Sequence, residues 1–175
     1  MSYSKLTFYL RNIKNLTSRK FWKSYNKVMG QKEKVIGAIK TLGLILAKHK
    51  ISWLIGGSGS LLLQGVDVIP NDIDLIVDPK DFLESKLILK DILINKTESD
   101  INTKKVSFRV DGISGELLAY KIDRNLLTTV NLDGVTIFVH QLQVELEYYK
   151  LRKDNKEENQ KKVKLIEKAL LSLKS

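Results

Sequence analysis

The segment from Trp53 to Val77 constrains the fold of this chain more than any other, and it reads WLIGGSGSLLLQGVDVIPNDIDLIV. An apolar, β-prone run at 51–55 leads into a glycine-serine turn at 56–60. A short helix is predicted to begin at Leu61, and a second strand covers 71–77. This order of strand, turn, helix and strand predicts two neighbouring strands of one sheet, joined by a short connection.

Two aspartates, Asp72 and Asp74, lie two residues apart in the second predicted strand. Because side chains alternate between the faces of a strand, both carboxylates point to one face while Ile73 and Leu75 point into the core. Their Cα atoms are expected about 6.6 Å apart. Carboxylates at this spacing repel one another unless a cation lies between them, and oxygen ligands favour Mg²⁺ or Mn²⁺. The free N–H groups of a helix that starts at the glycine-serine turn can bind phosphate.

These motifs resemble those of a known superfamily. Gly57-Ser58, followed by Asp72-Ile73-Asp74-Leu75, resembles the glycine-serine and Asp-x-Asp motifs of the nucleotidyltransferase superfamily, which has the polymerase-beta-like fold. More narrowly, the chain is similar to the small bacterial and archaeal nucleotidyltransferase proteins, over residues 34–173. The resemblance implies an α/β (α+β) fold, with a mixed sheet of four or five strands, flanking helices and a C-terminal helical pair.

Hydrophobic periodicity and turn residues predict the remaining elements. They are helices over 32–49, 80–94, 141–153 and 163–173, a polar loop over 95–104, and hairpins at Asp111-Gly112 and Asp133-Gly134. We expect three parts: a basic amphipathic helical arm at 1–30, a nucleotidyltransferase core at 31–140, and C-terminal helices at 141–175 that pack on the core.

Two further site residues rest on the resemblance. Family members carry a third carboxylate on a strand like the one predicted over 113–119, and Glu116 matches that position. Asp111 is a poorer candidate because the hairpin turn already explains it. Lys150 matches a lysine that meets the nucleotide triphosphate in similar proteins. An exposed sheet position for Glu116 and an ordinary surface position for Lys150 remain open alternatives.

The resemblance implies the transfer of a nucleoside monophosphate from a nucleoside triphosphate to an acceptor hydroxyl, with release of pyrophosphate. The implied metal-binding and catalytic residues are Asp72, Asp74 and Glu116, with Mg²⁺ or Mn²⁺ as cofactor. The implied nucleotide-binding residues are Gly57, Ser58, Ser60 and Lys150. Many relatives carry an Arg-x-Thr-type approach to the first aspartate, where this chain has Ile69-Pro70-Asn71. This departure weakens the inference about phosphate contacts at that point.

The basic charge of the chain is concentrated at its N-terminus. The net charge is +10, and because the first 31 residues contain seven basic and no acidic residues, the rest carries only +3. Aromatic residues are interspersed, and 3–29 are predicted to form one or two amphipathic helices that end near Gly30. Such an arm can pack on the domain, bind RNA through stacking and phosphate contacts, or act as a presequence or membrane-surface helix.

The acceptor hydroxyl is open at this point. The basic arm favours RNA, with transfer RNA as one candidate, and a role in a toxin–antitoxin pair would add an antitoxin as partner. Small-molecule (antibiotic) or protein nucleotidylation and a catalytically inactive nucleotide- or partner-binding module are the alternatives. The absence of cysteine excludes disulfides and thiolate zinc sites. The absence of cysteine also agrees with the cytoplasmic location that we expect. Since no apolar run approaches the ~20 residues of a membrane span, we expect no membrane segment.

Overall fold

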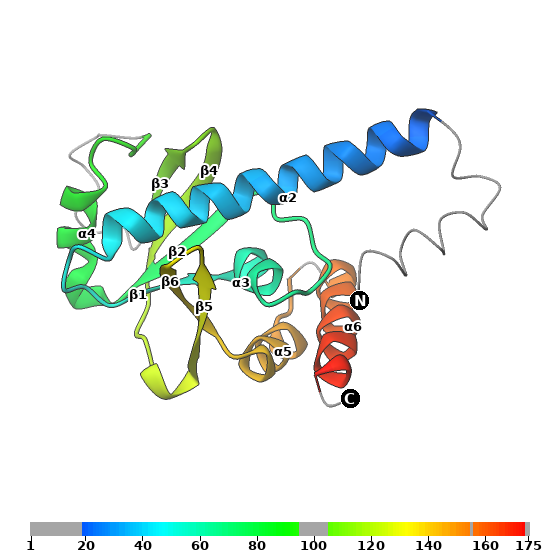
Figure 1. The fold of residues 1–175 in the computed structure, drawn as a ribbon. Helices are drawn as coiled ribbons and strands as arrows, with labels where there is room; N and C mark the ends of the chain where they lie inside the picture. The colour runs from blue at the N-terminus through cyan, green and yellow to red at the C-terminus, as the bar shows by residue number, and fades with distance from the viewer. Residues whose placement is uncertain (1–18, 95–104, 155, 174–175) are drawn as a thin grey trace.

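The computed structural model describes residues 19–94, 105–154 and 156–173, with the side chains of 19–23 left out. Its strands form one six-stranded mixed sheet in the order β3-β4-β2-β1-β6-β5 (Figure 1). The strands are β1 (Trp53–Gly56), β2 (Ile73–Val77), β3 (Lys105–Val110), β4 (Ile113–Ala119), β5 (Leu127–Leu132) and β6 (Val135–His140). The helices are α2 (Arg19–Leu46), α3 (Gly57–Leu63), α4 (Phe82–Ile88), α5 (Leu142–Leu151) and α6 (Lys156–Ser172), with short 3₁₀ turns at Pro79–Asp81 and Arg124–Leu126.

The centre of the sheet is formed by β1 and β2, which pair antiparallel from Trp53↔Val77 to Gly56↔Asp74. The predicted neighbourhood of these two strands is therefore confirmed. On either side a parallel partner extends the sheet, β4 beside β2 and β6 beside β1. The mixed α+β fold is confirmed, but the expected four or five strands were too few. Both strands of the 127–140 hairpin join the sheet, because β6 pairs along β1.

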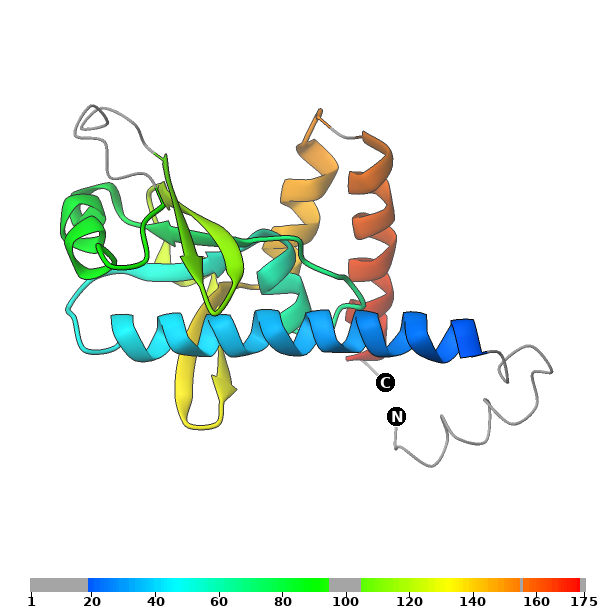
Figure 2. The same cartoon turned by 90° about the horizontal axis from the view of Figure 1, so that it is seen from above.

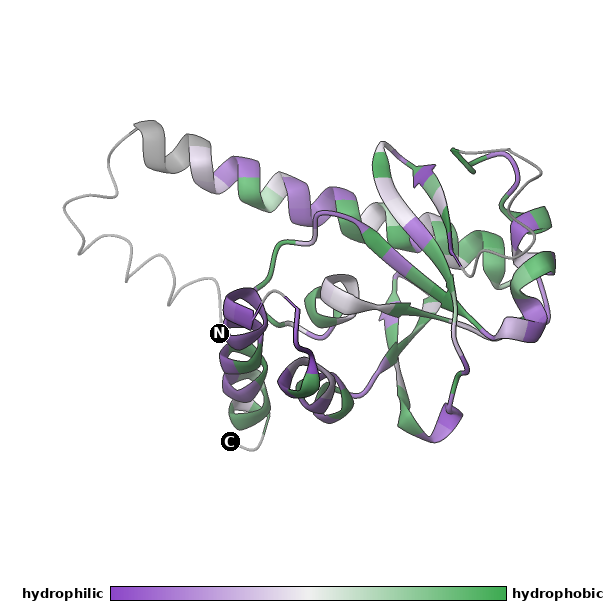
Figure 3. Ribbon diagram, turned by 180° about the vertical axis from the view of Figure 1, so that it is seen from behind, coloured by the Kyte–Doolittle hydropathy of each residue, from purple (hydrophilic) through white to green (hydrophobic). Residues whose placement is uncertain are grey.

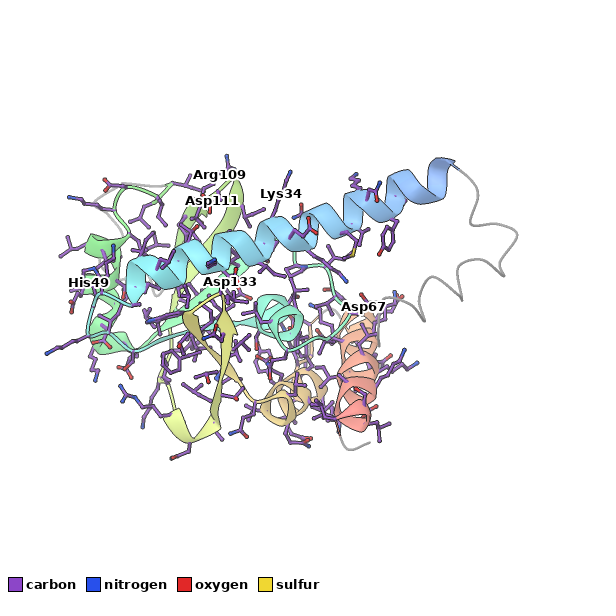
Figure 4. The ribbon with its side chains drawn as sticks, in the orientation of Figure 1. Lys34, His49, Asp67, Arg109, Asp111 and Asp133 are labelled. Atoms are coloured by element: carbon purple, nitrogen blue, oxygen red, sulfur yellow. The ribbon has the colours of Figure 1, made fainter. Side chains whose placement is uncertain are left out.

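Helix α2 crosses one face of the sheet and covers most of the main core (Figure 1). Val35, Ile39 and Leu42 are fully buried in this core. Two hairpin turns hold the helix in place: Thr41 Oγ1 donates to Asp111 Oδ2 at 2.6 Å, and Lys40 Nζ donates to Asp133 Oδ2 at 2.9 Å. Figure 4 labels both aspartates beside α2.

The C-terminal helices α5 and α6 run side by side in opposite directions, as the predicted helical pair requires (Figure 2). They pack against α3 and the segment that follows it through a second apolar cluster. This cluster consists of Leu61, Val66, Val68, Leu142, Leu146, Tyr149 and Ile166. Because α5 is attached through α3, it stands beside the sheet face that α2 does not cover.

Several predicted boundaries were wrong. Helix α2 is continuous through Gly30, so the arm helix and the helix predicted over 32–49 are one element. A glycine inside a helix costs only about 1 kcal/mol relative to alanine, which helix-forming neighbours and a buried face can offset. The glycine-serine run is itself the first turn of α3, α4 covers only half of its predicted length, and α6 begins at Lys156, seven residues before its predicted start.

Part of the prediction falls outside the described residues, namely 1–18 of the basic arm and the polar loop over 95–104. The prediction that the arm binds RNA therefore stays a prediction. Within the part of the chain that the structure describes, no helix is both long enough and apolar enough to cross a bilayer.

The continuous helix through Gly30 can be tested by substitution. A Cβ added at Gly30 would meet no atom within 4 Å. We expect Gly30→Ala to stabilise the protein by about 0.5–1 kcal/mol and to raise the melting temperature by about 1–4 °C. Gly65→Ala is the matched control, because a Cβ at Gly65 would also meet no atom within 4 Å, but the φ of this residue is +82°. We expect Gly65→Ala to destabilise the protein. A lower melting temperature for Gly30→Ala would contradict a helix interior at this position.

Candidate active site

Two rows of residues cross the central strands on the face opposite α2. In the first row Gly56, Asp74 and Glu116 are consecutive register partners on β1, β2 and β4. In the second row Leu54, Ile76 and Leu118 are paired in the same way. Because Ile73 and Leu75 alternate with these positions and are fully buried beneath α2, the two rows face away from that helix. Figure 3 views the molecule from this side and shows hydrophilic and hydrophobic bands along the strands.

Asp74 and Glu116 of the first row and all three residues of the second row form the floor of a cavity of about 590 Å³. One wall is formed by Glu145 and Tyr148 of α5 and by Arg152, which directly follows this helix. The rest of the rim comes from Lys105 of β3, His140 at the end of β6, and residues 120–122 after β4. Charged side chains and apolar surface therefore line the same space, which suits a ligand that carries both.

Gly57 brings the start of α3 against the Asp74 carboxylate. Its φ is +57°, which L-residues with a side chain rarely adopt, and a Cβ at this position would overlap Asp74 Oδ2. Both the backbone conformation and the close approach thus require glycine. The glycine of the predicted glycine-serine motif therefore lies directly beside the second aspartate of the Asp-x-Asp motif.

The Asp74 carboxyl group is partly buried, and its pKa is raised above the ordinary value of 3.8. Burial is the largest cause, followed by the negative charges of Asp72 and Glu116, while Arg152 and Lys105 lower the pKa. Relative to a carboxyl group in water, the folded state thus disfavours the ionised form of Asp74, and a cation placed beside the group would favour that form.

Glu116 is held by an ion pair with Lys105, whose Nζ lies 2.5 Å from Glu116 Oε1. The hydrogen bond to Glu116 raises the pKa of the exposed Lys105 ammonium. The predicted third carboxylate therefore lies next to Asp74 on the adjacent parallel strand, with a lysine as its present counter-charge.

Asp72 lies outside the strand that was predicted to contain it, since β2 begins at Ile73. It is exposed and is not among the residues that line the cavity. In the ranges that the structure describes, no three histidine, cysteine, aspartate or glutamate side chains are gathered closely enough to bind a metal ion. The structure thus brings Asp74 and Glu116 together, with Asp72 near enough to affect the pKa of Asp74.

Of the four predicted nucleotide-binding residues, one lines the cavity and the other three have partners within the protein. Gly57 lines the cavity, and Ser58 shares a hydrogen bond with the buried Tyr149 hydroxyl, whose pKa is raised chiefly by burial. Ser60 is fully buried, with its hydroxyl accepting from Gln64 Nε2 at 3.1 Å. Lys150 turns away from the cavity and pairs with Glu147 at 3.5 Å and with Glu167 of α6 at 3.8 Å.

Asp111, the poorer alternative for the third carboxylate, lies at α2 and not at the cavity (Figure 4). It is bound to Thr41 on the opposite face of the sheet from Asp74.

Sequence reasoning did not assign Lys105, Lys121, His140, Glu145 and Arg152 to the site, although all five line the cavity. A signal was present for α5, because Glu145, Tyr148 and Arg152 follow a spacing of three and four residues and so share one helix face. No comparable signal marked Lys105, whose position depends on the pairing of β3 with β4.

No protein-family profile matches the sequence, and no curated protein is significantly similar to it. A crystal structure from Thermotoga maritima, described as a proposed nucleotidyltransferase, matches with a TM-score of 0.54 and 23% identity, over 86% of this chain and 94% of the other. The chain has the nucleotidyltransferase fold. The fold that the sequence motifs implied is thereby confirmed.

Two further structures share the nucleotidyltransferase fold with this chain. An antigenic nucleotidyltransferase-like protein from Paracoccidioides brasiliensis matches with a TM-score of 0.54 and 15% identity, over 77% of this chain and 75% of the other. The antibiotic-resistance factor ANT(2'')-Ia matches with a TM-score of 0.50 and 12% identity, over 83% of this chain and 85% of the other. At these sequence identities, the similarity between the structures shows a shared fold and no more.

The contact between Gly57 and Asp74 gives a test of the site. The resemblance predicts metal-dependent nucleotide binding at this site, and we expect Gly57→Ala to abolish it, because the new Cβ would displace the Asp74 carboxylate. Gly112→Ala is the matched control: Gly112 also has a positive φ, but a Cβ there would meet nothing within 4 Å. Calorimetric titration of both variants checks this, and equal nucleotide affinities for the two would argue against the contact.

Proposed function

We propose that this chain is a nucleotidyltransferase that moves a nucleoside monophosphate from a nucleoside triphosphate to an acceptor hydroxyl. The observation that carries the proposal is the pairing of Asp74 with Glu116 on adjacent parallel strands, at the floor of a cavity that opens beside Gly57. Three structures with the same fold are described as nucleotidyltransferases, as nucleotidyltransferase-like, or as an antibiotic-resistance factor, which supports the assignment.

The donor chemistry of the site fits a hard divalent cation. Carboxylate oxygens suit Mg²⁺ or Mn²⁺, and the pKa of Asp74 is raised by burial and then by the charges of Asp72 and Glu116, so a cation beside it would favour its ionised form. Asp74 and Glu116 would hold the ion, with Asp72 as a further ligand, and the ion would replace Lys105 as the counter-charge of Glu116. When bound, such an ion neutralises phosphate charge and lowers the pKa of a hydroxyl.

Cationic side chains around the carboxylates suit a triphosphate. Lys105, Lys121 and Arg152 line the cavity from three different elements of the chain. Arg152 stacks over the Tyr148 ring, with its guanidinium carbon 5.7 Å from the ring centroid, and pairs with Asp154 at 2.6 and 2.7 Å. These contacts fix the orientation of the guanidinium, which can then bind phosphate oxygens through its remaining donors.

The reaction needs few covalent contributions from the protein. The acceptor oxygen would form a bond to the α-phosphorus, the bond from that phosphorus to the bridging oxygen would break, and pyrophosphate would leave. The hydroxyl proton would pass to a carboxylate, for which Glu116 is the candidate. Positioning and charge stabilisation supply most of the rate in such transfers.

We favour RNA as the acceptor, because the basic residues before Gln31 have no acidic neighbours in sequence. We favour the cytoplasm as the location, because a chain without cysteine fits a reducing compartment. A toxin–antitoxin role, with an antitoxin as protein partner, is compatible with this acceptor. A small hydroxylated compound is the second candidate, since one structure of the same fold is an antibiotic-resistance factor.

The proposed activity can be tested by incubating the protein with each labelled nucleoside triphosphate, Mg²⁺ and, separately, cellular RNA, a hydroxylated antibiotic or cellular protein. We expect label to appear on an acceptor, with RNA the best. Asp74→Asn, Asp72→Asn and Glu116→Gln should each lower transfer at least about 100-fold while the circular dichroism spectrum is kept. Asp91→Asn, which replaces an exposed carboxylate that does not line the cavity, should remain active. Transfer that survives Asp74→Asn would refute the proposal.

The role of α5 can be tested separately. Arg152 lines the cavity and Lys150 does not, so we expect Arg152→Ala to weaken nucleoside triphosphate binding about tenfold and Lys150→Ala to change it less than about threefold. Dissociation constants from calorimetry measure both effects. A larger loss of affinity in Lys150→Ala than in Arg152→Ala would instead assign the triphosphate contact to Lys150, as the resemblance implied.

A further inference from the structure

Glu145 is a buried carboxylate that the proposed reaction does not use. It lies in the first turn of α5, is only 3% exposed, and lines the cavity. Its Oε1 is the one buried side-chain oxygen or nitrogen that has no hydrogen-bond partner among the described residues. A buried, unpaired acceptor is costly unless a donor reaches it, so the cavity offers Glu145 to the hydrogen-bond donors of a ligand.

His140 does not fill this need. Its Nδ1 lies 3.6 Å from Glu145 Oε1, which is beyond hydrogen-bond distance. The backbone oxygen of His140 accepts a hydrogen bond from Gln64 Nε2 at 2.9 Å. His140 and Glu145 thus form a polar corner at the end of β6, where the carboxylate keeps its acceptor capacity.

The wall formed by α5 is anionic at one end and cationic at the other. Glu145 and Arg152 are seven residues apart on the same helix face, which corresponds to about 10.5 Å along the axis. Glu145 would repel phosphate, while Arg152, with Lys105 across the cavity, would attract it. A ligand that fits this wall carries phosphates at one end and N–H donors at the other.

The floor beneath Glu145 suits a flat ring. The row Leu54, Ile76 and Leu118 is apolar, and it lies beside the charged row of Asp74 and Glu116. Gly56 keeps the two rows in contact, because a Cβ there would come within 2.7 Å of Ile76 Cδ1. Apolar surface next to a phosphate-binding region is the arrangement that a nucleobase and its triphosphate require.

We propose that Glu145 accepts hydrogen bonds from the nucleobase of the bound nucleotide. Through these bonds it favours guanine most strongly, and cytosine and adenine less strongly, over uracil. Guanine presents two adjacent donors, N1–H and the 2-amino group, to a carboxylate that only accepts. Cytosine and adenine present one amino group. Uracil presents a single N–H between two carbonyl oxygens, which the carboxylate repels. This inference rests on the proposed function, because it concerns the nucleotide of that reaction.

The test measures the affinities of GTP, CTP, ATP and UTP for the full chain with Mg²⁺ and without acceptor. We expect wild-type protein to bind GTP at least about tenfold more tightly than UTP, with CTP and ATP between them. In Glu145→Gln the ratio should fall below about threefold, because the amide can donate to a uracil carbonyl. Glu147→Gln is the matched control, since Glu147 is exposed on the same helix and pairs with Lys150, and it should keep the wild-type ratio.

The possible results distinguish the proposed role of Glu145 from the proposed transfer reaction. Equal wild-type affinities for the four nucleotides, or an unchanged ratio in Glu145→Gln, overturn the role of Glu145 and leave the transfer reaction intact. If no nucleotide binds, both the role of Glu145 and the proposed function are overturned. If Glu145→Gln does not fold, the ratio of the GTP and UTP affinities of the wild-type protein still tests the proposal. A purely structural role for Glu145 would change the melting temperature of Glu145→Gln without changing this ratio.

Discussion

The two-sided character of the central strands is the constraint on which the rest of the structure depends. Along β2 the buried residues Ile73, Leu75 and Val77 alternate with Asp74 and Ile76. The buried set binds α2 and forms the main core, so the alternate set must face the other side. A shift of one residue in the pairing would bury Asp74 and expose the core, which fixes the register strongly.

That register produces the candidate site. Because β2 is parallel to β4 and antiparallel to β1, residues far apart in the sequence become direct neighbours, as Asp74 does with Glu116 and Gly56. The polar row has an electrostatic cost, seen in the raised pKa of Asp74. Functional sites commonly hold such unfavourable groups, which a bound cation or substrate relieves.

The second apolar cluster determines what the helix α5 presents to the cavity. Leu142, Leu146 and Tyr149 are buried against α3, and this fixes the rotation of α5 about its axis. Lys150 and Arg152 are separated by about 200° around the helix, so one faces away when the other faces the cavity. The packing directs Lys150 to Glu167 of α6 and Arg152 to the cavity.

The sequence by itself determined the elements that depend on local patterns. Alternation in β2, the Asp-Gly turns of two hairpins and the glycine beside the first strand could all be predicted, because each follows from backbone geometry or from one strand period. From these the resemblance led to the fold. The tertiary structure alone decided the partner of Glu116, the burial of Ser60, the position of Asp72 before β2 and the choice of Arg152 over Lys150 at the cavity. These features depend on strand pairing and helix rotation, which are set by contacts between segments distant in the sequence and leave no local pattern.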